Sequence, residues 1–412
     1  MQKETKRIKR LIIFAVCYLS YTAIYIARMN LSIASVELTT EGVLTASRIG
    51  VLGTVFAVIY AAGRFFNGRI GDKIHPSVHI LAGLLLTAAC NAALTALPPY
   101  AVFALLWGVN AFGQSMLWGA ILRVVAEVYP ERKAKKVSSY MVTSVATGNV
   151  LGILVNTAIV KYCGLKYAFL IPAAIVAACF IFALIFLTRI PVEARAEKDK
   201  TQVLTFKEIF TDKRVRKICL PVFIHGVIKD NVSFWMTLFF ASAYGIDLSK
   251  IALFIVFIPL VGLLGRLIFP VLYRIMKENE HFVSVAAYAI CFAACMFLVF
   301  VRSSMVFSAV CLGLVYASLS VVNTAALSIF PLRFAERGGI ASISGLMDLF
   351  AYFGYGVGSL VFGYVIEPFG FTPVFAVWAA LAAVALFLTL PLAKSEGKAV
   401  KTNEINEEEG NE

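Results

Sequence analysis

Twelve runs of mostly apolar residues alternate with short polar segments along the chain. Each run is about twenty residues long or more, and at 1.5 Å per residue a helix of that length crosses a hydrocarbon core of about 30 Å. The pattern therefore predicts twelve transmembrane helices, near residues 11–36, 46–68, 78–97, 100–128, 137–161, 165–190, 217–243, 250–273, 282–301, 305–330, 338–366 and 371–393.

One long polar segment, from Pro191 to Lys217, divides these helices into two sets of six. We therefore expect an all-α membrane protein built from two pseudo-symmetric six-helix bundles. The predicted organisation is an N-terminal bundle at 1–190, a cytoplasmic linker at 191–216, a C-terminal bundle at 217–394 and a disordered cytoplasmic tail at 395–412.

The amino-acid composition is typical of a membrane-embedded chain. Of its 412 residues, 60% are hydrophobic and 15% charged, whereas roughly half the residues of a soluble protein are apolar and about a quarter are charged. The net charge of +13 comes from Lys and Arg in short connectors and not from one basic face, so we expect a lipid bilayer and no nucleic acid as partner. Basic and poorer connectors alternate, which predicts that both termini lie in the cytoplasm. We also expect a multi-pass protein of the cell (inner) membrane and a monomer.

Short motifs in the first half recur in the second. Gly63-Arg64 at the end of the second predicted helix reappears as Gly265-Arg266, 202 positions later. Tyr129-Pro130 reappears as Phe330-Pro331, 201 positions later. Nearly equal offsets indicate an internal duplication, which in transporters places the substrate site between the repeats near the middle of the bilayer.

Arg28 lies inside the first apolar run without an acidic residue nearby in that helix. A cation at mid-membrane depth costs about 2.5 to 3.5 kcal/mol, so it should face a cavity or a partner. Tyr21 and Tyr25 precede it at helical spacing and place phenol hydroxyls beside the guanidinium, a donor-rich face suited to oxyanions. The alternative is an Arg whose side chain extends to the external interface.

Lys229 occupies the position of Arg28 in the second repeat, 201 residues later. Two facing cations would require a multivalent anion to offset their repulsion. Asp230 offers another interpretation, in which it pairs with Lys229 when no substrate is bound. His225, one turn from Lys229, is either a proton-sensitive neighbour or a structural residue.

Four more charged residues lie in or near predicted helices. Arg64 is either a site residue or extends to the cytoplasmic interface. Arg123 and Glu127 are four apart, and form either an intrahelical pair or contacts inside the bundle. Asp348 lies among glycines that permit close helix packing, as a structural carboxyl or as a site residue.

The sequence lacks the motifs of intramembrane enzymes. No HExxH, no GxSxG and no cluster of carboxylates with His occurs, and the eight Cys residues have no CxxC pairing. We therefore expect a protein that is not an enzyme, binds no metal and uses no cofactor.

Several motifs resemble a known family. Gly68-Arg-Ile-Gly-Asp72-Lys73 resembles the loop signature of the major facilitator superfamily, and Asp72, Arg123 and Glu127 are candidates for coupling or gating, together with Asp230. The first and seventh helices resemble the organophosphate:phosphate antiporters, which include glycerol-3-phosphate and hexose-phosphate exchangers. The resemblance covers most of the chain without its tails.

The resemblance implies a set of substrate-binding residues. In that family the Arg of the Tyr-x-x-x-Tyr-x-x-Arg-x-Asn motif binds phosphate, and a second Arg precedes a Trp by six residues. The resemblance therefore implies the substrate-binding residues Tyr21, Tyr25, Arg28, Arg64, Trp118 in Gly113-Gln114-Ser-Met116-Leu-Trp118, Ser144, Lys229, Trp235, Asp348 and Tyr352. Two positions depart from the family, because Lys229 replaces the second Arg and Ser144 replaces a His of the glycerol-phosphate exchangers.

The resulting hypothesis is a secondary transporter that exchanges a small anionic substrate, an organic phosphate, for inorganic phosphate by alternating access. One alternative is proton-coupled symport of an organic carboxylate such as a sugar acid, with Asp230, Glu127 or Asp348 as the protonatable group. The other is a membrane sensor that binds sugar phosphate without transporting it.

Overall fold

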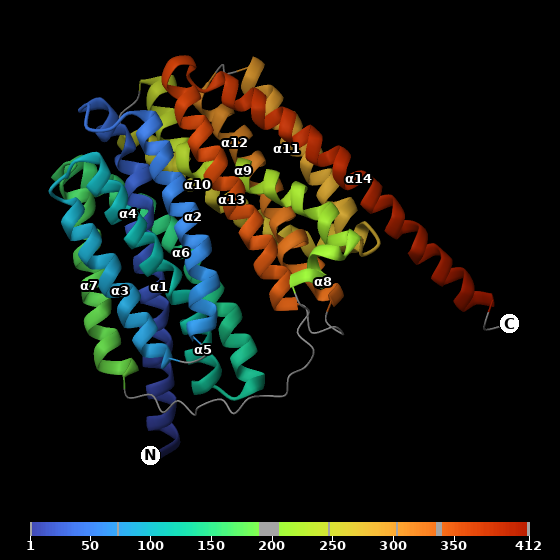
Figure 1. Cartoon of the computed structure of the whole chain (residues 1–412), viewed down its shortest axis with the longest axis horizontal. Helices are drawn as coiled ribbons and strands as arrows, with labels where there is room; N and C mark the ends of the chain where they lie inside the picture. Colours follow the sequence, from blue (N-terminus) through green and yellow to red (C-terminus); the bar gives the residue numbers. More distant parts are fainter. Residues whose placement is uncertain are drawn as a thin grey trace. The chain divides into compact units, whose positions relative to one another are not determined.

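The computed structural model describes residues 2–71, 74–188, 206–245, 248–301, 304–334 and 340–409 (Figure 1). In these ranges the chain is almost entirely helical, with helices joined by short turns. The helices are α1 (Gln2–Thr40), α2 (Ala46–Gly71), α3 (Pro76–Leu94), α4 (Tyr100–Ser115), α5 (Leu117–Val128), α6 (Glu131–Cys163), α7 (Tyr167–Leu187), α8 (Phe206–Thr211), α9 (Lys213–Tyr244), α10 (Leu248–Ile275), α11 (Glu280–Phe300), α12 (Met305–Thr324), α13 (Ile340–Phe369) and α14 (Thr372–Glu409).

Eleven spans in the described part of the chain are long and apolar enough to cross a membrane. The twelfth predicted helix is α9, which is 32 residues long. Its middle contains His225, Lys229 and Asp230, which lower its mean hydropathy without shortening the helix. The prediction of an all-α protein with twelve transmembrane helices is therefore confirmed.

Two predicted spans contain breaks in the regular helix. The span at 100–128 divides into α4 and α5 at Met116, whose N–H donates to the carbonyl of Gly113 at 3.2 Å, a tighter turn than that of an α-helix. After α12 the chain passes through a π-helical segment, Ala325–Ile329, and a 3₁₀ segment, Phe330–Phe334. Pro331 lies there, and proline cannot continue the pattern of α-helical hydrogen bonds.

The last helix, α14, extends into the predicted disordered tail at 395–412, whose disorder stays a prediction. Figure 1 shows α14 continuing as one helix, and it ends at Glu409. Residues 395–409 contain no proline and include several Lys and Glu residues, which are good helix formers. The helical preference of this segment extends α14 beyond its apolar part.

The chain divides into two compact units. The first unit comprises Met1–Lys198 and Phe234–Val256, and the second comprises Asp199–Ser233 and Phe257–Glu412. Within the first unit the Ser32 hydroxyl on α1 donates to the carbonyl of Phe234 on α9 at 2.7 Å. The predicted bundle boundaries at 190 and 217 thus stay a prediction, because α9 contributes to both units.

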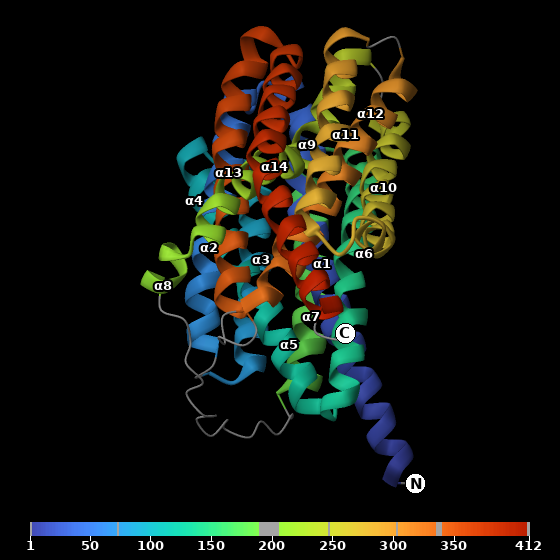
Figure 2. The ribbon, with the colours of Figure 1, turned by 90° about the vertical axis from the view of Figure 1, so that its right-hand side faces the viewer.

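Each unit buries its own core. In the first unit α1 packs on α6 and α7, and α3 packs on α4 and α7. In the second, α11 lies beside α14 and α12 (Figure 2). The helices meet through small residues, as expected where van der Waals packing joins helices in lipid.

One helix contact is repeated in both units. In the first unit Gly63 on α2 lies against Ser115 on α4, where an added Cβ would collide with the serine hydroxyl. In the second unit Gly265 on α10 lies against Ala317, where an added Cβ would be 2.5 Å from the carbonyl oxygen. Both partners are displaced by 202 positions, the offset of the Gly-Arg motif. The sequence repeat therefore corresponds to a repeated helix crossing.

Candidate functional site

Arg28 lies among buried side chains from three helices of the first unit. Its Nε donates to Oε1 of Gln114 on α4 at 2.8 Å. Its Cζ lies 4.6 Å from the ring centroids of Tyr25 and Tyr60 and 5.1 Å from that of Phe56. Gln114, Tyr60 and Phe56 are at most 5% exposed. The guanidinium is thus fixed by one amide and three aromatic rings.

A chain of buried amides supports this arrangement. Gln114 Nε2 donates to Asn110 Oδ1 at 3.1 Å, and Asn91 Nδ2 donates to the same oxygen at 3.3 Å. Asn91 Oδ1 in turn accepts from Asn30 Nδ2 at 2.8 Å. Because the Gln114 nitrogen is engaged by Asn110, its oxygen is directed to Arg28. This network connects α1, α3 and α4, and hydrogen bonds in such buried networks reinforce one another.

The tyrosines predicted beside Arg28 form part of an aromatic cluster. Tyr21 and Tyr25 make an edge contact with ring centroids 5.4 Å apart, and Tyr21 packs on Trp118 at 4.8 Å. Arg64 on α2 acts electrostatically on the hydroxyl groups of Tyr21 and Tyr60, as does Arg28. Five predicted site residues of the first unit are therefore brought together: Tyr21, Tyr25, Arg28, Arg64 and Trp118.

Lys229 in the second unit has a different environment. Its Nζ donates to Asp230 Oδ1 at 2.6 Å, and the same nitrogen lies 5.5 Å from the ring centroid of Tyr316 on α12. Lys229 is 8% exposed, whereas Asp230 is half-buried. The ion pair that the sequence offered as an alternative is therefore present in the structure. An anion at Lys229 must compete with the Asp230 carboxylate.

The other predicted residues are buried or half-buried. The Ser144 side chain is fully buried, and its hydroxyl donates to the carbonyl of Met141 in the same helix at 2.5 Å. Trp235 is 1% exposed and makes an edge contact with Phe234. Asp348 and Tyr352 are half-buried on α13, one turn apart.

The candidates for coupling are only partly described. Arg123 Nη1 donates to the carbonyl of Ile74 at 2.8 Å, and its Nε lies 4.0 Å from Glu127 Oε1. The intrahelical pair thus exists, with the backbone before α3 as a second partner of Arg123. Asp72 lies outside the described residues.

Sequence reasoning did not select four residues that contact the two cations: Gln114, Tyr60, Phe56 and Tyr316. Gln114 occurs in the quoted fourth-helix motif and Tyr60 lies four residues before Arg64, but only the fold shows that they reach Arg28. Tyr316 lies 202 positions after Gln114. Applying the repeat offset to the fourth-helix motif was the signal that would have found it.

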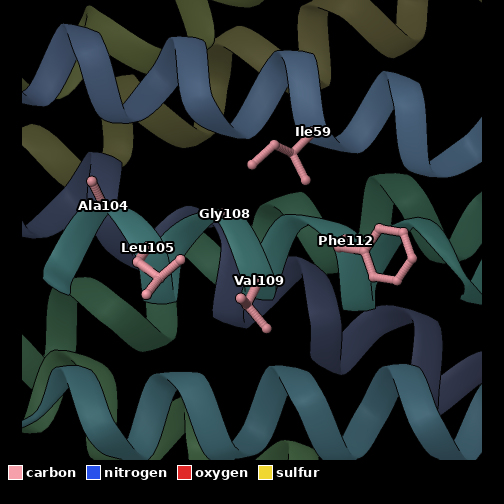
Figure 3. A pocket seen from close by; sticks show the side chains of 6 residues that line it. All are labelled: Ile59, Ala104, Leu105, Gly108, Val109 and Phe112. Atoms are coloured by element: carbon pink, nitrogen blue, oxygen red, sulfur yellow. The ribbon is translucent and has the colours of Figure 1, made fainter. Parts of the chain in front are cut away.

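A cavity of about 220 Å³ opens between α2 and α4 of the first unit. Figure 3 shows that it is lined by apolar side chains, namely Ile59, Ala104, Leu105, Gly108, Val109 and Phe112. It contains no charged group, and none of the predicted site residues lines it. This cavity is therefore unsuited to an anion.

The fold is that of a multi-span helical membrane protein, and the similar proteins given next show a transporter and not an enzyme. A family model described as Major Facilitator Superfamily matches residues 17–347. The chain therefore belongs to the Major Facilitator Superfamily. A crystal structure of the nucleoside transporter NupG has the same fold, with a TM-score of 0.72 and 15% identity, covering 93% of this chain and 98% of that one.

Two similar proteins carry names that state a function. A "Probable hexose phosphate transport protein" of Chlamydia trachomatis is 21% identical over 437 aligned positions, which cover 94% of this chain and 92% of that protein. The "Membrane sensor protein UhpC" of Salmonella typhimurium is 33% identical over 97 residues, which cover 24% of this chain and 22% of that protein. The resemblance to the organophosphate:phosphate antiporters is confirmed by these relatives.

Proposed function

We propose that this protein transports a phosphorylated organic anion, of the sugar-phosphate class, in exchange for inorganic phosphate. The observation that carries the proposal is the buried setting of Arg28, whose guanidinium is oriented by Gln114 and three rings. A planar guanidinium binds two phosphate oxygens in parallel, and Arg is favoured wherever such two-point recognition matters. The hexose phosphate transport relative agrees with this chemistry.

Transport by alternating access follows from the difference between empty and occupied sites. A ligand shifts a conformational equilibrium only by its difference in affinity for the two states. A phosphate dianion bound at Arg28 stabilises the closed state through its charge, and an empty site resists closure. Obligate exchange is the consequence. The organic part of the substrate is assigned to Asp348 and Tyr352, one turn apart on α13.

The test is counterflow in proteoliposomes loaded with phosphate. External labelled phosphate should accumulate, and Arg28→Ala should reduce the rate by more than about a hundredfold, as expected when charge-assisted hydrogen bonds to an anion are lost. The matched control is Arg48→Ala, because Arg48 also lies over a ring, that of Tyr100 at 5.2 Å, but outside the Arg28 cluster. Equal rates in the two variants contradict the proposal.

The Lys229–Asp230 pair favours a second candidate, proton-coupled symport of an organic carboxylate. Protonation of Asp230 would release the Lys229 ammonium to the substrate, so one proton would accompany each anion. Substrate-dependent alkalinisation of the medium, lost in Asp230→Asn, identifies this mechanism. Exchange that needs only phosphate on both sides excludes it.

The third candidate, a sensor that binds sugar phosphate without transport, is favoured by the local identity to the UhpC sensor. Binding of glucose 6-phosphate without counterflow identifies it. In all three candidates the protein is a monomer of the inner membrane with both termini in the cytoplasm, an orientation that accessibility of an engineered terminal cysteine tests.

A further inference from the structure

Arg266 is a cation in the middle of a membrane-spanning helix. The apolar span of α10 is Leu253–Ile275, and Arg266 lies nine residues before its end, about 14 Å along the axis. The side chain is half-buried, and among the described residues no carboxylate forms an ion pair with it. From the sequence we expected Arg266 near the helix end. At this depth it needs a polar partner.

Arg266 lies beside the Lys229 region of the same unit. The Tyr316 ring, 5.5 Å from Lys229 Nζ, packs on Gly262, where an added Cβ would be 2.5 Å from Cε1 of the ring. Gly262 and Arg266 are one turn apart on α10 and share a face. Arg266 accordingly acts electrostatically on both Lys229 and His225.

His225 supplies a second, independent observation. It is 1% exposed on α9, one turn before Lys229, and neither ring nitrogen has a hydrogen-bond partner among the described residues. The backbone of Leu319 lies close to the ring without the geometry of a hydrogen bond. A neutral imidazole always carries one N–H donor, and a buried donor without a partner costs free energy. An anion beside Lys229 and Arg266 would accept from it.

The first unit contains a corresponding arrangement. Arg64, 202 positions before Arg266, acts on the tyrosines that surround Arg28. In the second unit the charge of Lys229 is already balanced by Asp230, so a surplus positive charge there comes from Arg266. The repeat thus provides each unit with two cations, on its first and second helices.

We propose that the second unit holds an oxyanion subsite of its own, formed by Lys229, Arg266 and His225, which binds inorganic phosphate or the phosphoryl group of the substrate. The identity of the ligand rests on the proposed function, and the subsite adds further binding residues to that function.

The first experiment measures binding of labelled inorganic phosphate to the full chain in a maltoside detergent. Its head groups carry no phosphate, so binding reports the free anion and not a lipid. In Arg28→Ala we expect weakened but measurable phosphate binding, and in Arg28→Ala/Arg266→Ala none. Loss of all binding in Arg28→Ala alone overturns the second subsite and leaves the exchange function intact. No binding by the unsubstituted chain overturns both.

The second experiment compares single variants. Arg266→Ala should weaken phosphate binding about tenfold, and Arg266→Lys less, because the charge is kept. Arg274→Ala is the matched control, since Arg274 is exposed in the last turn of the same helix. Equal effects at 266 and 274 would indicate long-range charge alone and overturn the proposal.

Substitutions of His225 show whether its imidazole binds the anion or only packs in the helix bundle. His225→Leu should weaken phosphate binding about fivefold, and His225→Gln less, because an amide keeps a donor. Melting temperatures without phosphate show whether each variant is folded. If His225→Leu and His225→Gln bind phosphate as the unsubstituted chain does, the imidazole takes no part in the subsite.

Discussion

Arg28 and Lys229 occupy equivalent positions of the repeat, yet the two units hold them differently. Arg28 is oriented by a neutral amide and three rings. Lys229 is paired with the neighbouring carboxylate of Asp230 and lies over one ring. The duplication therefore conserves the position of a cation but not the groups that contact it. An anion that binds Lys229 must displace the Asp230 carboxylate.

The largest expected effect comes from exchanging the two cation types. Arg28→Lys loses the planar fork and the Nε bond to Gln114, so the KM for phosphate in counterflow should rise roughly thirtyfold or more. Lys229→Arg should change it less than about fivefold, because that position relies on charge and not on a fork. Equal effects of the two substitutions would remove the distinction between the units.

The amide network of the first unit gives the next effect. Asn110→Leu leaves the buried amides of Gln114 and Asn91 without their acceptor, and each unsatisfied group costs about 1–3 kcal/mol. We expect a lower melting temperature in detergent and a raised KM for phosphate. The control is Asn149→Leu, since the Asn149 amide donates only to the Val145 carbonyl one turn away. A change in KM at Asn149 as large as that at Asn110 would contradict an orienting role.

A smaller effect of opposite sign is expected in the second unit. Asp230→Asn removes the carboxylate that competes with the anion for Lys229, so phosphate affinity should increase about fivefold, equivalent to roughly 1 kcal/mol. Titration calorimetry in detergent measures it. Gln114→Leu is the counterpart in the first unit and should weaken binding. Weaker binding in Asp230→Asn would mean that Asp230 assists the site.

The smallest effect concerns the start of α9. The Asp212 side chain accepts from the backbone N–H of Arg214 at 2.8 Å, and its hydrogen bonds to the Arg214 side chain lower the pKa of that carboxyl. A lowered pKa means that this stabilisation is complete above the ordinary pKa of an aspartate and is lost as pH falls through the folded-state value. Asp212→Ala should destabilise the chain by about 1 kcal/mol or less at pH 7, as is typical of a lost helix cap.

Melting temperatures of Asp212→Ala and of the unsubstituted chain should be measured at pH 7 and near pH 3. The difference between the two proteins should be smaller near pH 3. A difference that is constant with pH would assign the effect to helix propensity and not to the charge of Asp212.

The sequence was sufficient for the spans and for the presence of the two cations. An Arg in an apolar run stands out without coordinates, and the repeat offset located Lys229. The sequence did not show which carbonyl the Ser144 hydroxyl contacts, nor that α14 is helical through Glu409. The hydrophobic pattern predicts which segments lie in lipid. It does not predict the rotamer of a hydroxyl group or how far a helix continues into a polar segment.

What the sequence determined by itself is the set of membrane helices, because length and apolarity are local properties that the bilayer selects directly. What only the tertiary structure decided is the identity of the partners of each cation. Gln114 is 86 positions from Arg28, and Tyr316 is distant from Lys229, so no local pattern connects them. Even for adjacent residues, the pairing of Lys229 with Asp230 depends on the desolvation that the packed helices of the second unit impose.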